Sequence, residues 1–155
     1  AVIAAEDSKF MSHNGFDYKA IQIALKKNIK ERKIVAGGST ISQQLAKNLF
    51  LSTEKTILRK IEEAIITLML ESVMTKRRIL EIYLNIIEWG DNVFGINAAA
   101  SHYYDIHISS LSIQQSSHLA AMIPNPNFYD KNRDSPLLLK KADIIQHRLA
   151  SAKIP

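Results

Sequence analysis

The strongest constraint on the fold of this chain is the spacing of its apolar residues. They recur at helical intervals and nowhere alternate with polar residues over the length of a strand. A half-buried strand needs a period of two, whereas residues three and four apart share one face of a helix. Because the chain has only 5 Gly and 4 Pro, few positions interrupt helices, and the sequence predicts an all-α domain. The clearest stripe, which we expect to be buried, consists of Ile57, Ile61, Ala64, Ile65 and Leu68.

Capping residues and prolines mark the expected helix boundaries. Asp, Ser and Thr side chains accept hydrogen bonds from the free N–H groups of a first helical turn, and Pro suits the first helical position. We expect residues 125–135 to form a loop. The predicted helices run from Asp17 into the basic stretch 26–33, from Ser39 or Thr40 to about Leu51, from about Thr56 to Ser72, from Thr75 through Ile87 to near Gly90, from Ser112 to Ile123, and from Ser135 through Leu149.

Length and charge narrow the class of protein. The 155 residues fit one compact domain, predicted to span residues 1–155. With 20 Lys and Arg against 15 Asp and Glu, the net charge is +5, which favours an anionic partner such as lipid or nucleic acid. The absence of Cys excludes disulfides and thiolate zinc sites. The longest apolar run, 64–70, is too short to span a membrane, so we expect any membrane anchor to lie outside this sequence.

An acid pair near the start is the first candidate for catalysis. Glu6 and Asp7 end an apolar segment just before a turn that contains His13 and Gly15. An apolar flank raises the pKa of a carboxyl group and suits it to proton transfer near neutral pH. Glu6 is therefore a candidate general base. The alternative is that Glu6 and Asp7 form a solvated helix face, that His13 is a turn residue, and that Asp17 only caps the next helix.

The segment 37–48 is a candidate binding element. Two glycines precede a helix start, where free N–H groups and the helix dipole favour an anion. Thr40, Gln44 and Lys47 share one face of that helix, and this row of hydrogen-bonding side chains suits a ligand rich in hydroxyl or amide groups. The alternative is a glycine turn followed by a well-capped amphipathic helix.

A cation cluster begins the next predicted helix. Arg59 and Lys60 lie one turn before Glu63, and the order of Arg59 and Glu63 is the less favourable one for an i,i+4 pair. Together with Lys47 and Lys55, these cations could surround a diphosphate, whose charge requires several fixed donors. The alternative is a solvated helix flank. The run 76–78 is interpreted as surface, because cations are unfavourable in a first helical turn.

In their order along the chain, these motifs closely resemble those of the peptidoglycan glycosyltransferases, family 51 of the glycosyltransferases. The resemblance extends from residue 1 to about residue 150. The segments 89–91, 95–99 and 123–126 are most similar to the monofunctional biosynthetic branch, and a fragment of a bifunctional protein is the alternative. The resemblance rests on Glu6-Asp7-x-x-Phe10-x-x-His13-x-Gly15-x-Asp17, on Gly37 to Asn48, on Arg59-Lys60-x-x-Glu63 and on Ile79-Leu80-Glu81-x-Tyr83-Leu84-Asn85.

The resemblance implies a lysozyme-like helical enzyme that polymerises lipid II into β-1,4-linked glycan strands, with inversion at the donor sugar and release of undecaprenyl pyrophosphate. Matched motif by motif, Glu6 would be the general base and Glu63 a second essential acid near the donor pyrophosphate. Asp7 and His13 would shape the surroundings of the base. The diphosphate and sugar groups would be held by Ser39, Thr40, Gln44, Lys47, Asn48, Lys55, Arg59 and Lys60.

The same resemblance implies partners and a location. The partners would be lipid II, the growing lipid-linked strand, a membrane surface and other cell wall synthesis proteins, but no nucleic acid. The catalytic domain would lie on the periplasmic or outer face of the bacterial cytoplasmic membrane, with apolar residues near 21–25 and 34–35 entering the membrane interface. No cofactor is required, no metal site is assigned, and a Mg or Mn ion near the pyrophosphate is compatible with this chemistry.

Three positions depart from the usual family pattern, and two other functions compete with it. Asn97 and Gln115 replace common acids and Tyr104 replaces a common Phe, which affects only local packing or a peripheral contact. A lysozyme-like hydrolase or lytic transglycosylase would also use a carboxylic acid on a helical scaffold, but cleavage needs no cations for a diphosphate. A basic nucleic-acid binder would leave the paired acids unexplained.

Overall fold

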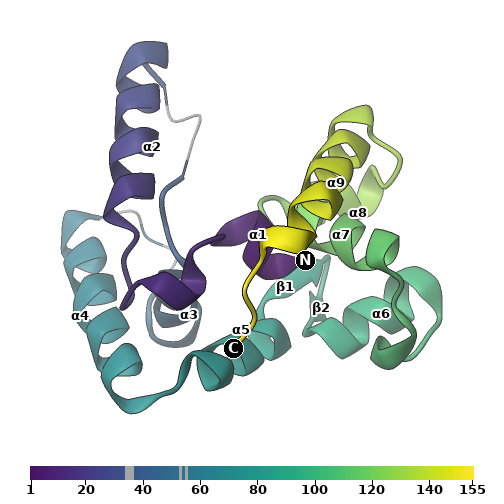
Figure 1. Cartoon of the computed structure of the whole chain (residues 1–155), viewed down its shortest axis with the longest axis horizontal. Coiled ribbons are helices and arrows are strands. Elements are labelled where there is room, and N and C mark those ends of the chain that lie inside the picture. Colours follow the sequence, from purple (N-terminus) through teal and green to yellow (C-terminus); the bar gives the residue numbers. More distant parts are fainter. Residues whose placement is uncertain (34–36, 53, 55) are drawn as a thin grey trace. The chain divides into compact units, whose positions relative to one another are not determined.

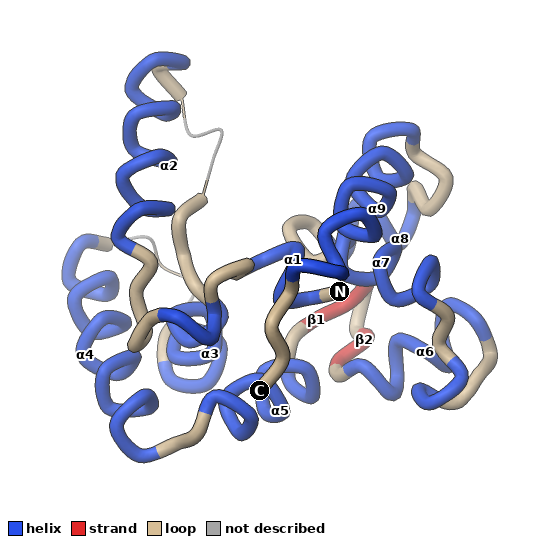
Figure 2. Tube along the Cα trace, in the orientation of Figure 1, coloured by secondary structure: helices blue, strands red, loops and turns tan. Residues whose placement is uncertain are grey.

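The computed structural model describes residues 1–33, 37–52, 54 and 56–155. The chain divides into two compact units, here called unit 1 and unit 2. Unit 1 consists of residues 1–8 and 81–154, and unit 2 of residues 9–80 together with Pro155. Helices dominate both units, as the tube in Figure 2 shows.

Unit 2 contains helices α2 (Tyr18–Glu31), α3 (Ile41–Phe50) and α4 (Ile57–Val73), preceded by a 3-10 turn at Phe10–Ser12. It ends in the first turns of α5 (Lys76–Ile86), which continues into unit 1. Helix α3 packs against α4 (Figure 1). Asp17 caps α2, Thr40 caps α3 and Thr56 caps α4, each by accepting a hydrogen bond from a first-turn N–H group.

Unit 1 is built around the pair of helices α7 (Ile113–Met122) and α9 (Pro136–Arg148), and the short α1 (Val2–Glu6) packs against both. Its core includes the fully buried side chains of Leu119, Met122 and Leu138. The remaining elements are a hairpin of β1 (Glu88–Gly90) and β2 (Val93–Phe94), helices α6 (Ile96–Tyr104) and α8 (Pro126–Lys131), and 3-10 turns at Ile108–Ser110 and Leu149–Ser151.

The predicted all-α class is confirmed, with two local corrections. The antiparallel hairpin of β1 and β2 was not expected, because strands of two and three residues are too short to show a period of two. The stretch 125–135 was predicted to be a loop, but α8 occupies much of it. Pro126 takes the first helical position and Tyr129 is buried, so tertiary packing stabilises a helix whose local sequence resembles a loop.

Helix α4 corrects the prediction of a buried apolar stripe. Four of its five members, Ile57, Ile61, Ile65 and Leu68, are exposed, and Ala64 is only half-buried. The buried face instead carries Glu63, Thr67 and Leu70. The periodicity located a helix correctly but could not tell which of its faces meets α3. Among the described residues, no helix has both the length and the apolar content needed to cross a membrane.

Candidate functional site

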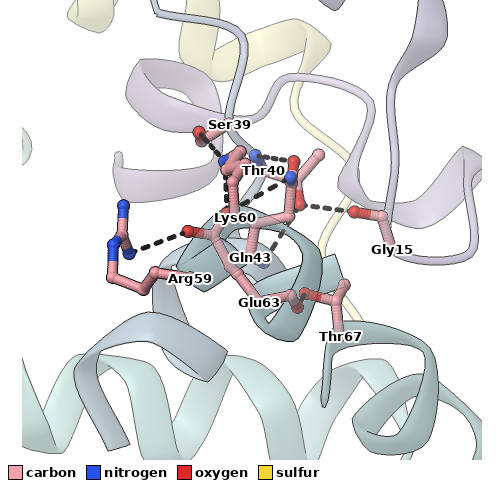
Figure 3. Close-up of polar contacts among 8 residues, drawn as sticks. All are labelled: Gly15, Ser39, Thr40, Gln43, Arg59, Lys60, Glu63 and Thr67. Atoms are coloured by element: carbon pink, nitrogen blue, oxygen red, sulfur yellow. Dashed lines mark hydrogen bonds and ion pairs between the residues drawn. The ribbon is translucent and has the colours of Figure 1, made fainter. Parts of the chain in front are cut away.

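The candidate site of unit 2 centres on the buried carboxylate of Glu63, whose side chain is only 3% exposed. Lys60 forms an ion pair with its Oε1, and Arg59 Nη1 lies 3.4 Å from its Oε2 (Figure 3). Gln43 Nε2 donates to Oε1 over 3.4 Å from α3. Two cations facing one carboxylate leave the cluster with a net charge of about +1. Of the predicted cation cluster, Arg59 and Lys60 thus belong to a cation-rich network that α3 and α4 share.

The predicted binding residue Thr40 has a capping role in this structure. Its hydroxyl donates to the carbonyl oxygen of Gly15 over 2.6 Å and accepts from the N–H of Gln43 over 3.2 Å. Gln43 Oε1 in turn accepts from the N–H of Thr40, which completes a capping box. Thr40 is buried, whereas its neighbour Ser39 is exposed and accepts a hydrogen bond from Lys60 Nζ over 3.4 Å. Ser39 therefore presents the more accessible hydroxyl group.

Gly38 is required for packing next to this cap. A Cβ atom at Gly38 would lie 2.9 Å from Cα of Ile21 and 3.3 Å from the carbonyl oxygen of Ala20. Both are backbone atoms of α2, so a larger residue would push that helix away. The sequence-based hypothesis gave the two glycines an anion-binding role, but close approach of α2 already explains Gly38.

The remaining predicted binding residues of this unit differ in accessibility. Lys47 and Asn48 on α3 are exposed, and Gln44 is half-buried. Lys47 and Asn48 are thus accessible to a ligand, and Gln44 is partly accessible. Lys55 lies outside the described residues.

Unit 1 holds the predicted base. Glu6 ends α1 with a half-buried side chain, and Asp7 follows it buried. Burial, followed by the negative charges of Glu6 and Asp7, raises the pKa of Tyr83 well above its usual value. The fully buried Tyr83 of α5 therefore keeps its phenolic proton beside two acids. Tyr83 belongs to the motif at residues 79–85, but the sequence did not indicate a role for it. Because Glu6 belongs to unit 1 and Glu63 to unit 2, their joint action stays a prediction.

The other members of the first motif lie in unit 2. The ring of His13 meets that of Phe10 edge-on, with centroids 6.4 Å apart. Asp17 Oδ1 accepts from the N–H of Ala20 over 3.0 Å, and this hydrogen bond is the main reason why the pKa of Asp17 lies below its usual value. Asp17 is thus the helix cap that the sequence predicted.

Sequence reasoning missed a second polar cluster in unit 2. Ser42 Oγ donates to Glu71 Oε1, and Lys76 Nζ lies 2.6 Å from the same oxygen. Lys76 was interpreted as surface, but its side chain is only 15% exposed. Its pairing with Glu71 explains why a cation is tolerated in the first turn of α5. Glu71 lies five residues before Lys76, across the break between α4 and α5, so helical spacing could not reveal the pair.

A hollow of about 330 Å³ lies in unit 1 among α6, α7 and α9. Its polar groups are largely used within the protein. Tyr104 bonds His118 over 2.9 Å, and Gln115 accepts from the N–H of Ser112 over 2.9 Å. Gln115 thus completes the capping box of α7, as a Glu there would. The departure at position 115 has a local structural effect, and nothing in this hollow indicates a ligand.

The helical fold and the cation-rich network point to an enzyme class that handles anionic donor groups, and comparison with known proteins identifies the family. The family model described as "Transglycosylase" matches residues 1–150, so the chain belongs to this family. The resemblance seen in the sequence is confirmed, as are the lysozyme-like helical fold and the class of peptidoglycan glycosyltransferases, and a glycan hydrolase is not favoured.

Curated relatives align with the whole chain. The proteins named "Biosynthetic peptidoglycan transglycosylase" from Nitrosomonas eutropha, Nitrosospira multiformis and Methylobacillus flagellatus are 67%, 64% and 63% identical to it over all 155 residues. Those residues make up 64%, 67% and 68% of the respective relatives. The chain therefore spans about two thirds of the length of these relatives.

Proposed function

We propose that this chain is the catalytic part of a peptidoglycan glycosyltransferase that polymerises lipid II in bacterial cell wall synthesis. The observation that supports this function best is the network around Glu63, where a buried carboxylate orients two cations at the start of α4. A transferase that releases a lipid diphosphate needs positive charge at the leaving group, whereas hydrolysis of a finished glycan does not.

In the proposed reaction, Glu6 removes the proton from the 4-hydroxyl of the acceptor GlcNAc. That oxygen attacks C1 of the donor MurNAc, the bond from C1 to the phosphate oxygen breaks, and the α-linkage becomes a β-1,4 bond. The side chain of Glu6 is half-buried at the end of α1, so its carboxylate is not closed off from an acceptor hydroxyl. Asp7 and Tyr83 are the buried polar groups next to the base. His13 belongs to unit 2, so its role beside the base stays a prediction.

The leaving diphosphate is proposed to bind the cations of unit 2. The side chain of Lys60 is 50% exposed, so its ammonium group can contact Glu63 and a phosphate oxygen together. Arg59 is more buried, and it contributes a fixed positive charge. Ser39, Gln44, Lys47, Asn48 and Lys55 are proposed to hold further donor groups, and Thr40 acts through the cap that it forms.

A divalent cation near the pyrophosphate finds a poor donor set in these residues. Among the described residues, no three or more His, Asp or Glu side chains gather into a cluster that could hold a metal ion. Both oxygens of Glu63 already face cations, and a metal ion there would have to displace one of them. That the reaction requires no cofactor, and that a Mg or Mn ion is compatible with it, both stay predictions.

The surface of unit 2 supports a membrane partner in the cell envelope. Helix α2 carries exposed apolar residues beside Lys26, Lys27 and Lys30, a combination that suits an interface with anionic lipid. Helix α4 has an outward apolar face as well. Residues 34–35, also predicted to enter the membrane, lie outside the described residues. The exposed apolar side chains are Tyr18, Ile21, Ile23, Leu25 and Ile29 on α2, and Ile57, Leu58, Ile61, Ile65, Leu68, Met69 and Val73 on α4.

The test is to incubate the chain with labelled lipid II in detergent or liposomes and to separate the products by size. A long polymer that a muramidase degrades supports the proposal. Absence of polymer, together with clearing of intact sacculi, would instead identify a glycan hydrolase.

A pair of variants tests the diphosphate site. Lys60→Ala should weaken the binding of inorganic pyrophosphate and reduce polymerisation, because it removes the accessible cation of the Glu63 network. Glu62 lies next to this network on α4 but is exposed, and Glu62→Ala should leave both properties unchanged. Equal behaviour of the two variants would contradict the assignment of Lys60.

A further inference from the structure

The first turn of α3 is attached to α4 by two carboxylates. Gln43 Nε2 donates to Glu63 over 3.4 Å, and the adjacent Ser42 donates to Glu71. Glu63 and Glu71 are eight residues apart, roughly two helical turns, so the attachment points are well separated along α4. Both attachments hold the first turn of α3, in addition to the apolar packing of the fully buried Ile41 and Leu45.

Each carboxylate has its own counter-charge. Glu63 faces Lys60 and Arg59, and Glu71 faces Lys76. The side chains of Glu71 and Lys76 are 8% and 15% exposed, so this pair is largely withdrawn from water. Removing one partner of a largely buried ion pair leaves the other charge uncompensated. Lys76 therefore compensates the charge of the Glu71 carboxylate that accepts the hydrogen bond from Ser42.

The same cluster supports the loop of the first motif. Lys76 Nζ lies 4.5 Å from the ring centroid of Phe10, a cation–π contact. Gly15 has a φ of +90°, and a Cβ there would lie 2.8 Å from Thr67 and 3.4 Å from Glu71. The carbonyl oxygen of Gly15 also accepts the hydrogen bond from Thr40. The loop and the α3 cap are therefore packed around Glu71.

We propose that Glu71, paired with Lys76, is a positioning residue for the diphosphate site, which acts by fixing the first turn of α3 through Ser42. The inference rests on the proposed function of that site. Lys76 itself is not a further phosphate ligand, because its ammonium group is committed to Glu71 and to the face of Phe10. Without this attachment, the polar support of the first turn of α3 would rest more heavily on Gln43 and Glu63, the carboxylate that also orients Lys60 and Arg59.

The test compares variants that remove parts of the attachment. Ser42→Ala removes one hydroxyl and leaves both charges, Lys76→Met removes the counter-charge, and Lys76→Arg restores it. The exposed Arg77 gives a matched control, since Arg77→Met removes one charge from the same helical turn. The measurements are the dissociation constant of inorganic pyrophosphate, KM and kcat with lipid II, and amide hydrogen exchange across α3.

We expect Ser42→Ala and Lys76→Met to raise the pyrophosphate dissociation constant and KM about fivefold, the effect of losing one hydrogen bond. Amide exchange should become faster at residues 41–46, while α7 and α9 stay protected. Lys76→Arg should recover most of the loss, and Arg77→Met should behave as wild type. If Lys76→Met does not fold, the measurements on Ser42→Ala alone test the proposal.

The inference is overturned if folded Ser42→Ala binds pyrophosphate like wild type and shows unchanged exchange in α3. It is also overturned if Arg77→Met has the same effect as Lys76→Met. These outcomes differ from failure of the proposed function. If the proposed function fails, the wild-type chain will neither polymerise lipid II nor bind pyrophosphate. The amide exchange data would still report whether Ser42 and Glu71 hold α3.

Discussion

Replacing Glu63 by Gln tests whether its carboxylate holds the cation cluster together. The substitution keeps the shape of the side chain but removes the charge that faces Lys60 and Arg59. Breaking a fully buried ion pair costs about 3–5 kcal/mol. Lys60 is 50% exposed and can turn into water, whereas Arg59 is only 15% exposed and remains partly desolvated. We therefore expect a smaller loss of about 2 kcal/mol in the free energy of unfolding.

For a chain of this size, a loss of about 2 kcal/mol corresponds to a decrease in Tm of roughly 4–8 °C. Thermal and urea unfolding followed by circular dichroism would measure it, with the exposed Glu62→Gln on the same helix as a control expected within about 0.5 kcal/mol of wild type. Adding Arg59→Met to Glu63→Gln should recover part of the loss, because it removes the stranded cation.

The same variant has an opposite effect on binding. Removing the negative charge raises the net charge of the cluster from about +1 to about +2, so inorganic pyrophosphate should bind several-fold more tightly by calorimetry. Polymerisation should nevertheless decrease, because Lys60 and Arg59 lose the group that orients them. The reasoning is refuted if Glu63→Gln is as stable as Glu62→Gln, or if pyrophosphate binds more weakly.

Three further outcomes are expected. Glu6→Gln should abolish polymerisation of lipid II with an unchanged Tm, and normal turnover would exclude Glu6 as the base. Desolvation alone would raise the pKa of Asp130, but hydrogen bonds from His102, the N–H of Asp91 and Arg133 outweigh it and lower the pKa to about 2. The stabilisation by the Asp130 carboxylate should therefore be complete above pH 4 and lost as pH falls toward 2. Asp130→Asn should accordingly lower the free energy of unfolding at pH 7 by ~1 kcal/mol, and urea unfolding should show this difference shrinking below pH 4; a difference independent of pH would contradict the assignment. In flotation assays, the wild-type chain should rise with anionic liposomes, and Ile23→Asp on α2 should reduce the fraction of protein recovered with the lipid. Equal recovery of the wild type and of Ile23→Asp would exclude α2 as the membrane-binding surface.

Local features of the sequence were enough to predict much of the fold. The caps at Asp17, Thr40 and Ser112 lie where their residue types indicated, because capping depends on neighbours within one helical turn. The order of the motifs was specific enough to indicate the family, which the family match confirms. The helical class followed from periodicity, which is likewise a local property.

Tertiary packing decided which face of each helix is buried and which charged side chains pair. The apolar stripe of α4 faces outward and Glu63 inward, since a helix with apolar residues on several sides does not show in its sequence which side meets a neighbour. The burial of Lys76 depends on Glu71 and Phe10, which come from a different helix and from a distant turn. By itself, the sequence determined where the helices with a side-chain cap begin and which residue types carry the chemistry. Only the three-dimensional structure decided which charges are paired and buried, because a pair energy depends on distance and desolvation, and separation along the chain specifies neither.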